Sequence, residues 1–199
     1  IEEARTLVQR FNAGALPAPI TLINQQTINA DLGEDSLQKA LFAGMAGTIL
    51  VIIFMIGYYR KFGVYASIAL IMYITLTLAV FKLIPITLTL AGIAGLILSI
   101  GMAVDANILI FERTKEELKK GLKYQEAVEE GFKRAWTSIR DSNITTIITA
   151  IILYYATSSF VQGFALALLV GVLISMFSAI TITRTLLRVF VTKDLKTNT

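Results

Sequence analysis

The chain has 199 residues, 55% of them apolar and 16% charged, and it contains neither cysteine nor histidine. This composition is too apolar for an ordinary soluble domain and is typical of a polytopic membrane protein. The net charge of +4 comes from basic residues in short loops, without the interleaved aromatic residues of a nucleic-acid site. Disulfides and thiolate metal sites are excluded, and any proton chemistry must use carboxylates instead of imidazoles.

Residues 1–36 are expected to be the end of an external α+β domain, followed by a hinge. Residues 1–13 place apolar side chains on one helical stripe, and the run GALPAP at 14–19 ends that helix. Residues 20–28 could form a strand, which must pair with a sheet outside this chain because a lone strand is unstable. The polar run 29–36 is the expected hinge, with Ser36 as a candidate N-cap of the next helix.

Five membrane spans are expected next, because a helix needs about 20 apolar residues to cross a hydrocarbon core. They lie at about 37–58, 63–84, 87–111, 143–158 and 161–187, within a transmembrane domain of residues 37–190. Basic residues gather in the first and third links and in the tail 191–199, which places these three in the cytoplasm and the N-terminus outside. Five spans with an external N-terminus imply one missing upstream helix.

The third link, residues 112–142, is expected to be a structured element of the cytoplasmic membrane surface. Its segments 114–120 and 124–139 have the periodicity of amphipathic helices that lie along lipid. Its eight basic residues are nearly balanced by seven acidic ones, which argues against a purely polybasic lipid anchor. A solvated surface element is therefore favoured over a specific docking site.

Asp105 is the one acidic residue placed centrally in an expected span, within the stretch GMAVDANILIF at 101–111. A charge at this depth costs about 2.5–3.5 kcal/mol on insertion scales, and such residues usually mark ion pathways. The alternative is a carboxyl group that stays protonated or is satisfied by a backbone or hydroxyl partner. No basic residue is placed at the same depth, so an ionic partner would come from another polypeptide. Asn107 lies some 200° around the helix and should serve a different contact.

Polar residues also open the fourth span, where Asp141 and Ser142 are candidate N-caps. Asn143, Thr145 and Thr146 could supply hydrogen bonds to a proton pathway, although threonine can also bond its own helix backbone. Small residues recur at helical spacing in the third and fifth spans and predict close helix packing. The predicted packing residues are Gly92, Gly95, Gly101, Gly163 and Gly171.

Three segments carry a specific resemblance to a known family: GALPAP at 14–19, LTLAGIAGLILSIGMAVDANILIFERTKEEL at 88–118 and GFKRAWTSIRDSNITT at 131–146. They resemble the SecD side of the SecD/SecF family of protein-export membrane subunits, relatives of the resistance–nodulation–division (RND) transporters. The resemblance implies an all-α bundle with five of the six spans of an RND-type half. It also implies that Asp105 matches the family's proton-relay aspartate, with complementary groups on SecF.

The function that the resemblance implies is auxiliary to the Sec translocase in the cytoplasmic (inner) membrane. It includes partnership with SecF, docking near SecYEG, contact with the translocating preprotein and use of the proton-motive force. No cofactor is implied, and the choice between protons and sodium stays open. One alternative is half of an RND small-molecule or lipid exporter, which Ala106 disfavours because efflux relatives typically have two adjacent aspartates there. Another is a passive scaffold. No nucleophile–base pair, phosphate loop or metal cluster in the sequence indicates an enzyme.

Overall fold

The computed structural model describes residues 1–12, 30–84 and 88–188, and the regular structure in these ranges is helical. The chain divides into two units, residues 1–34 and residues 35–199. The first unit contains α1 (Glu2–Asn12), a helix where one was predicted. The predicted strand at 20–28, the break at 14–19 and the tail 191–199 lie outside the described residues.

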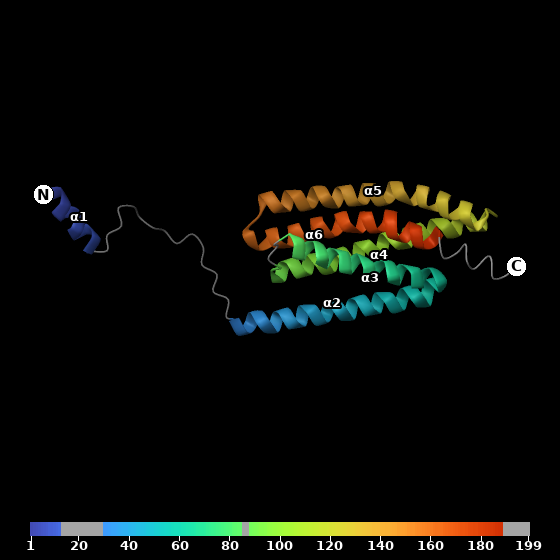
Figure 1. Cartoon of the computed structure of the whole chain (residues 1–199), viewed down its shortest axis with the longest axis horizontal. Helices are drawn as coiled ribbons and strands as arrows, with labels where there is room; N and C mark the ends of the chain where they lie inside the picture. Colours follow the sequence, from blue (N-terminus) through green and yellow to red (C-terminus); the bar gives the residue numbers. More distant parts are fainter. Residues whose placement is uncertain (13–29, 85–87, 189–199) are drawn as a thin grey trace. The chain divides into compact units, whose positions relative to one another are not determined.

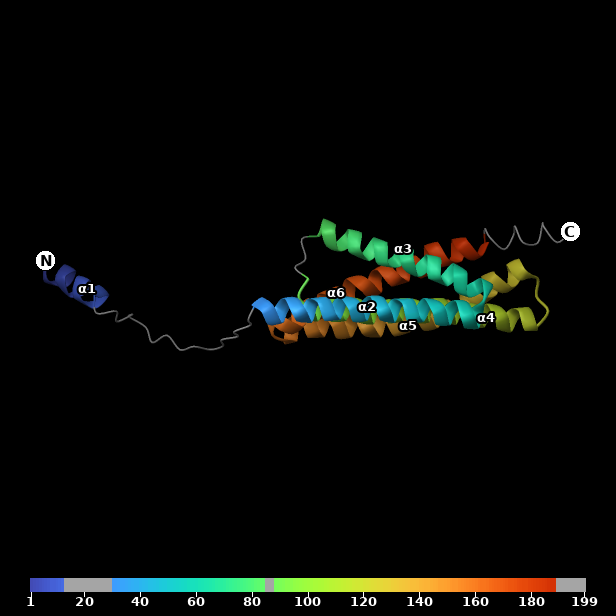
Figure 2. The same ribbon diagram turned by 90° about the horizontal axis from the view of Figure 1, so that it is seen from below.

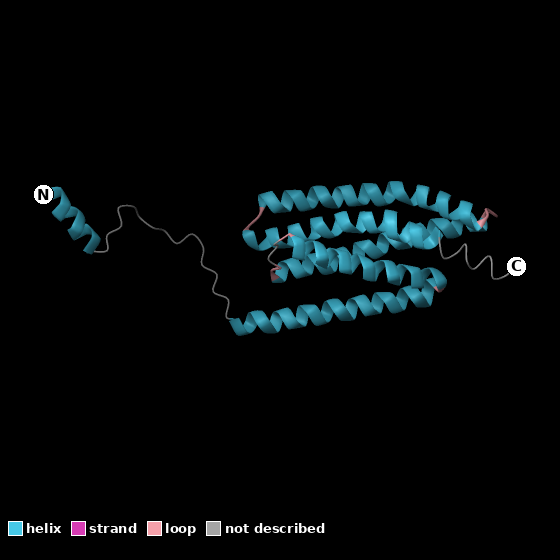
Figure 3. Cartoon of the chain, viewed as in Figure 1, coloured by secondary structure: helices cyan, strands magenta, loops and turns pink. Residues whose placement is uncertain are grey.

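The second unit is a bundle of long helices (Figures 1 and 2). Its described part is coloured as helix almost throughout in Figure 3, with short connections. The helices are α2 (Ala30–Tyr59, which belongs to this unit from residue 35 onward), α3 (Lys61–Leu83), α4 (Leu90–Lys119), α5 (Tyr124–Ala156) and α6 (Ser159–Ser178). A π-helical turn, η1 (Ala179–Thr183), follows α6 directly.

Helix α4 is the centre of this bundle. It packs against α5 and α6, which also pack against each other, while α3 packs on α4, α6 and η1. Figures 1 and 2 both show α4, α5 and α6 running alongside one another. The main apolar core lies toward the Lys119 end of α4, where the largest fully buried side chains include Tyr73, Phe111, Leu70, Ile110 and Leu187.

Helix α2 is apolar but touches the other helices at few points. Met55 and Tyr59 near its end join the core, and Gly44 faces Ile97 of α4, whose Cδ1 would lie 3.0 Å from an added Cβ. Most of the remaining large apolar side chains of α2 are exposed. In a bilayer this surface faces lipid or other helices, since an all-apolar helix surface is stable only there.

Four described helices are long and apolar enough to cross a membrane: Gly33–Tyr59, Lys61–Leu83, Leu90–Lys119 and Ser159–Arg188. For the described residues, the prediction of a helical polytopic membrane protein is therefore confirmed. The span predicted at 143–158 lies within α5, whose first half is charged and polar. The count of five spans and the preceding external α+β domain stay predictions.

Two local predictions are wrong, because helical structure extends beyond the apolar stretches. Residues 30–36 of the expected hinge belong to α2, so Ser36 lies inside a helix, as do Asp141 and Ser142 in α5. In the link 112–142, the helices predicted at 114–120 and 124–139 are present as the continuations of α4 and α5, and their place on the membrane surface stays a prediction. The two helices meet in a short turn around Gly121, whose φ of +90° suits glycine.

Candidate functional site

Asp105 lies midway along α4 and lines a groove of about 180 Å³ between α4 and α5. The wall from α4 is otherwise apolar, whereas the wall from α5 carries an amide and two hydroxyl groups. The lining residues are Met102, Asp105, Ala106, Leu109, Ile139, Ser142, Asn143 and Thr146. The groove therefore combines one carboxylate with polar groups of a neighbouring helix.

The carboxylate of Asp105 has no hydrogen bond or ion pair within the described part of the chain, and its side chain is exposed on the surface of the bundle. No basic residue lines the groove. An ionised carboxylate at bilayer depth needs a partner or a proton. Asp105 is therefore available to a proton, to water or to a group from another polypeptide.

Asn143 contributes a carboxamide to the groove, with 6% of the residue exposed and no hydrogen bond from its side chain to the described residues. Thr146 and Ser142 donate their hydroxyl protons to backbone carbonyls of α5, each over 3.1 Å. Their oxygen atoms remain free to accept a hydrogen bond. Thr145 is exposed, bonds the carbonyl of Asp141 over 3.0 Å and does not line the groove. The structure thus brings Asn143 and Thr146, but not Thr145, to Asp105.

Asn107 lies on another face of α4 and is bound to the end of the last span. Its Oδ1 accepts a 2.7 Å hydrogen bond from the hydroxyl of Thr183, and both residues are buried. Thr183 belongs to the π-helical turn η1. Turns of this kind are rare and are frequent at functional sites. The sequence reasoning missed Thr183, although a hydroxyl in an apolar span was a usable signal.

Four of the predicted packing glycines lie between α4 and its neighbours. A Cβ added at Gly95 would lie 2.6 Å from the carbonyl oxygen of Phe164, and one at Gly171 would collide with the hydroxyl of Ser99. Gly92 and Gly163 approach each other, with the carbonyl oxygen of Gly163 3.4 Å from an added Cβ at Gly92. These contacts hold α4 closely against α6.

Gly101 differs from the other four glycines. A Cβ added at this position would meet no atom within 4 Å, and the residue is exposed. Gly101 therefore makes no close helix contact within the described bundle. It lies one turn before Asp105, on the same open face of α4.

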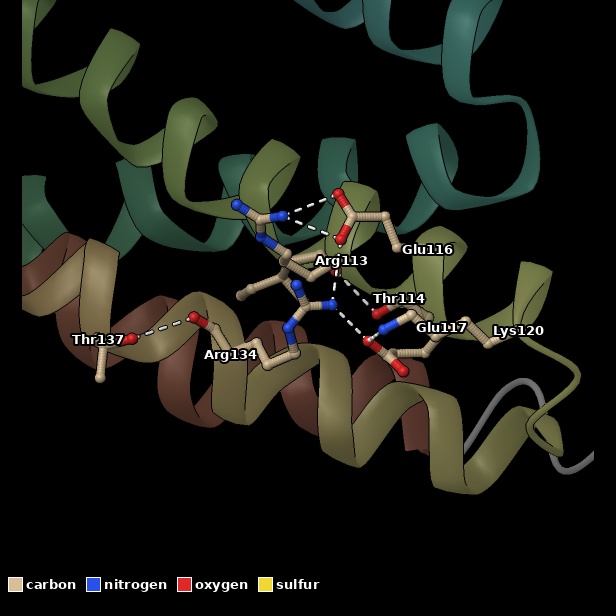
Figure 4. Close-up of polar contacts among 8 residues, drawn as sticks. Arg113, Thr114, Glu116, Glu117, Lys120, Arg134 and Thr137 are labelled. Atoms are coloured by element: carbon tan, nitrogen blue, oxygen red, sulfur yellow. Dashed lines mark hydrogen bonds and ion pairs between the residues drawn. The ribbon is translucent and has the colours of Figure 1, made fainter.

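Charged side chains join α4 to α5 beyond the groove (Figure 4). Arg134 of α5 lies between two acids of α4, donating to Glu116 over 3.1 Å and to Glu117, whose side chain is only 5% exposed. Lys120 also donates to Glu117, over 2.8 Å. The sequence showed the charge balance and the spacing of three residues that favours such pairs within a helix, but not the pairing between helices.

A second ionic cluster joins α5 to the end of the last span. Glu129 accepts hydrogen bonds from Arg188 and from Arg184, the latter over 2.6 Å. The bond from Arg188, with a contribution from Arg184, lowers the pKa of Glu129 to about 2. The guanidinium of Arg184 also lies 4.8 Å from the centre of the Phe132 ring. No pattern in the sequence indicated this cluster, because its members lie 55 and 59 residues apart.

Comparisons with known proteins place the chain in a family. Residues 11–193 match the family described as protein export membrane protein SecD/SecF, C-terminal. The chain is 53% identical over 192 residues to the protein translocase subunit SecD of Thermobaculum terrenum, covering 94% of this chain and 37% of the relative. With the SecD of Synechocystis it is 51% identical, covering 96% of this chain and 40% of the relative. The chain thus spans about two fifths of the length of these relatives.

The fold is also similar to that of a solved relative. The crystal structure of SecDF from Thermus thermophilus, described as a translocon-associated membrane protein, matches with a TM-score of 0.83 and 37% identity. The match covers 94% of this chain and 26% of that one. The chain therefore belongs to the SecD/SecF family of protein export membrane proteins, in whose C-terminal membrane region it lies.

Proposed function

We propose that this chain is the membrane portion of an auxiliary subunit of the Sec translocase, which uses the proton-motive force to promote export of preproteins across the cytoplasmic membrane. The names of the relatives support the assignment to protein translocation. The observation that carries the coupling is Asp105, an acid in the middle of a span without a partner in the described chain.

Proton binding at Asp105 would change how α4 interacts with what covers its open face. A neutral acid is compatible with an apolar neighbour, whereas the carboxylate requires a cation, water or hydrogen-bond donors. Since no basic residue lines the groove, the cation would come from outside the described residues. SecF is the proposed partner, and the SecYEG channel and the translocating preprotein are the proposed targets.

The changed interaction at Asp105 would shift α4 as a rigid body. The glycine contacts and the Asn107–Thr183 hydrogen bond hold α4 against the last span, so these helices would shift together. In this proposal the apolar half of α5 crosses the membrane as a fifth span, the N-terminal side is external and the C-terminus is cytoplasmic. No cofactor is needed, because the ion gradient supplies the energy.

Substitution of the proposed relay residue tests the function. Asp105→Asn in the full-length protein should abolish gradient-dependent export into membrane vesicles, while the complex still assembles. The matched control is Asp141→Asn, since Asp141 is an exposed acid paired with Arg140 that does not line the groove. Dissipating the proton and sodium gradients separately identifies the coupling ion. Unchanged export in Asp105→Asn would refute the relay and support a passive scaffold.

A further inference from the structure

The side chain of Asn143 has no hydrogen bond to the described residues, although only 6% of the residue is exposed. It faces the same groove as Asp105, yet no hydrogen bond joins the two side chains. A water molecule can bridge two polar groups that face one space without direct contact.

The groove has the volume and the chemistry to hold water. Its 180 Å³ accommodates several water molecules, each of which occupies about 30 Å³ in the liquid. A bound water also needs two to four polar partners. Asp105, Asn143 and the acceptor oxygens of Ser142 and Thr146 supply them, while Met102 and Leu109 leave the rest of the wall apolar.

An amide is suited to both protonation states of a nearby acid. Its NH₂ group donates hydrogen bonds and its carbonyl oxygen accepts them. It can therefore orient a water that donates to the carboxylate, or one that accepts from the protonated acid. A threonine or serine whose proton is already given to its own helix can only accept.

We infer that the groove between α4 and α5 holds ordered water that Asn143 orients toward Asp105, which makes Asn143 a positioning residue for this acid. The role of Asn143 in transport rests on the proposed function of Asp105 as a proton relay. The chemical contact itself can be measured without an export assay.

Infrared difference spectroscopy of the full-length protein in lipid vesicles tests this contact. The C=O stretching band of protonated Asp105 is assigned by its loss in Asp105→Asn. In Asn143→Leu, which has a similar volume but no polar side-chain atom, this band should shift to higher frequency because a hydrogen bond is lost. A band that is sensitive to heavy-oxygen water should disappear in the same variant.

Two adjacent threonines provide a matched control. Thr146→Val should move the Asp105 band in the same direction by a smaller amount, whereas Thr145→Val should leave it unchanged, because only Thr146 lines the groove. Asn143→Gln, which keeps the amide donors and the carbonyl acceptor, should retain the water-sensitive band. If Asn143→Leu does not fold, comparing Asn143→Ala with Asn143→Gln gives the same information.

The outcomes separate this inference from the proposed function. An unchanged Asp105 band in the Asn143 variants would overturn the positioning role, even if Asp105→Asn abolished export. Equal shifts for Thr145→Val and Thr146→Val would also overturn it. Unchanged export in Asp105→Asn, together with a shifted band in Asn143→Leu, would refute the relay and leave the water site in place.

Discussion

Replacing glycine by alanine at two positions of α4 measures the close contact between α4 and α6. At Gly95 the added Cβ would lie 2.6 Å from the carbonyl oxygen of Phe164 and 3.3 Å from the Cβ of Ala167. The helices must separate locally by about 0.8 Å before the first contact reaches an ordinary distance of 3.4 Å. Such overpacking typically costs about 1–3 kcal/mol. At Gly101 the added Cβ meets nothing within 4 Å.

Both substitutions gain the same intrinsic helix stability, about 0.5–1 kcal/mol, so their difference isolates the helix contact. Gly101→Ala should be neutral or slightly stabilising, and Gly95→Ala should be less stable than it by about 1–3 kcal/mol. For a chain of this size the difference corresponds to roughly 2–12 °C in Tm. Thermal unfolding in detergent micelles can be followed by circular dichroism and by the fluorescence of Trp136, the single tryptophan. Equal melting temperatures for the two variants would refute the close approach of α4 and α6.

Three further predictions concern the polar contacts. Asn107→Leu and Thr183→Val should each lower the free energy of unfolding by about 1–3 kcal/mol, because each leaves its buried partner unpaired. The double variant should lose less than the sum, and strict additivity in a double-mutant cycle would contradict the bond. Glu129 has a lowered pKa in the folded state, so its stabilising effect is complete above its ordinary pKa of 4.5 and is lost as the pH falls toward about 2. Glu129→Gln should therefore flatten the stability profile in this range, and an unchanged slope would argue against the Arg184–Arg188 cluster.

The division of α4 into faces could be predicted from the sequence. At 100° per residue, Gly92, Gly95 and Ser99 share one side, and all three are buried in the bundle. Gly101 and Asp105 share another side, and both are exposed. The small-residue pattern alone could not show that Gly101 lacks a neighbour. Small residues at helical spacing indicate where a neighbouring helix can approach closely. Whether one does depends on which helices the fold places there.

The placement of Asn143 and Thr146 in one groove with Asp105 could not be predicted from the faces of a single helix. It depends on the register between α4 and α5, which is set by the short turn between Lys119 and Tyr124. The predicted helix ends were also wrong. The end of an apolar stretch marks where a helix leaves the hydrocarbon core, but the helix itself continues because polar residues also form its backbone hydrogen bonds. The ionic partners of Glu129 depend on the same register. Spacing within one helix predicts its faces, and contacts between helices require their relative alignment.

The π-helical turn at Ala179–Thr183 determines the angular phase of the chain that follows it. Each residue of an α-helix advances the side-chain direction by about 100°, so the wider turn offsets every later residue by one such step. Arg184 and Arg188 both meet Glu129 with this offset in place. Deleting one residue from the turn would rotate both guanidinium groups by more than a quarter of a revolution, away from that carboxylate.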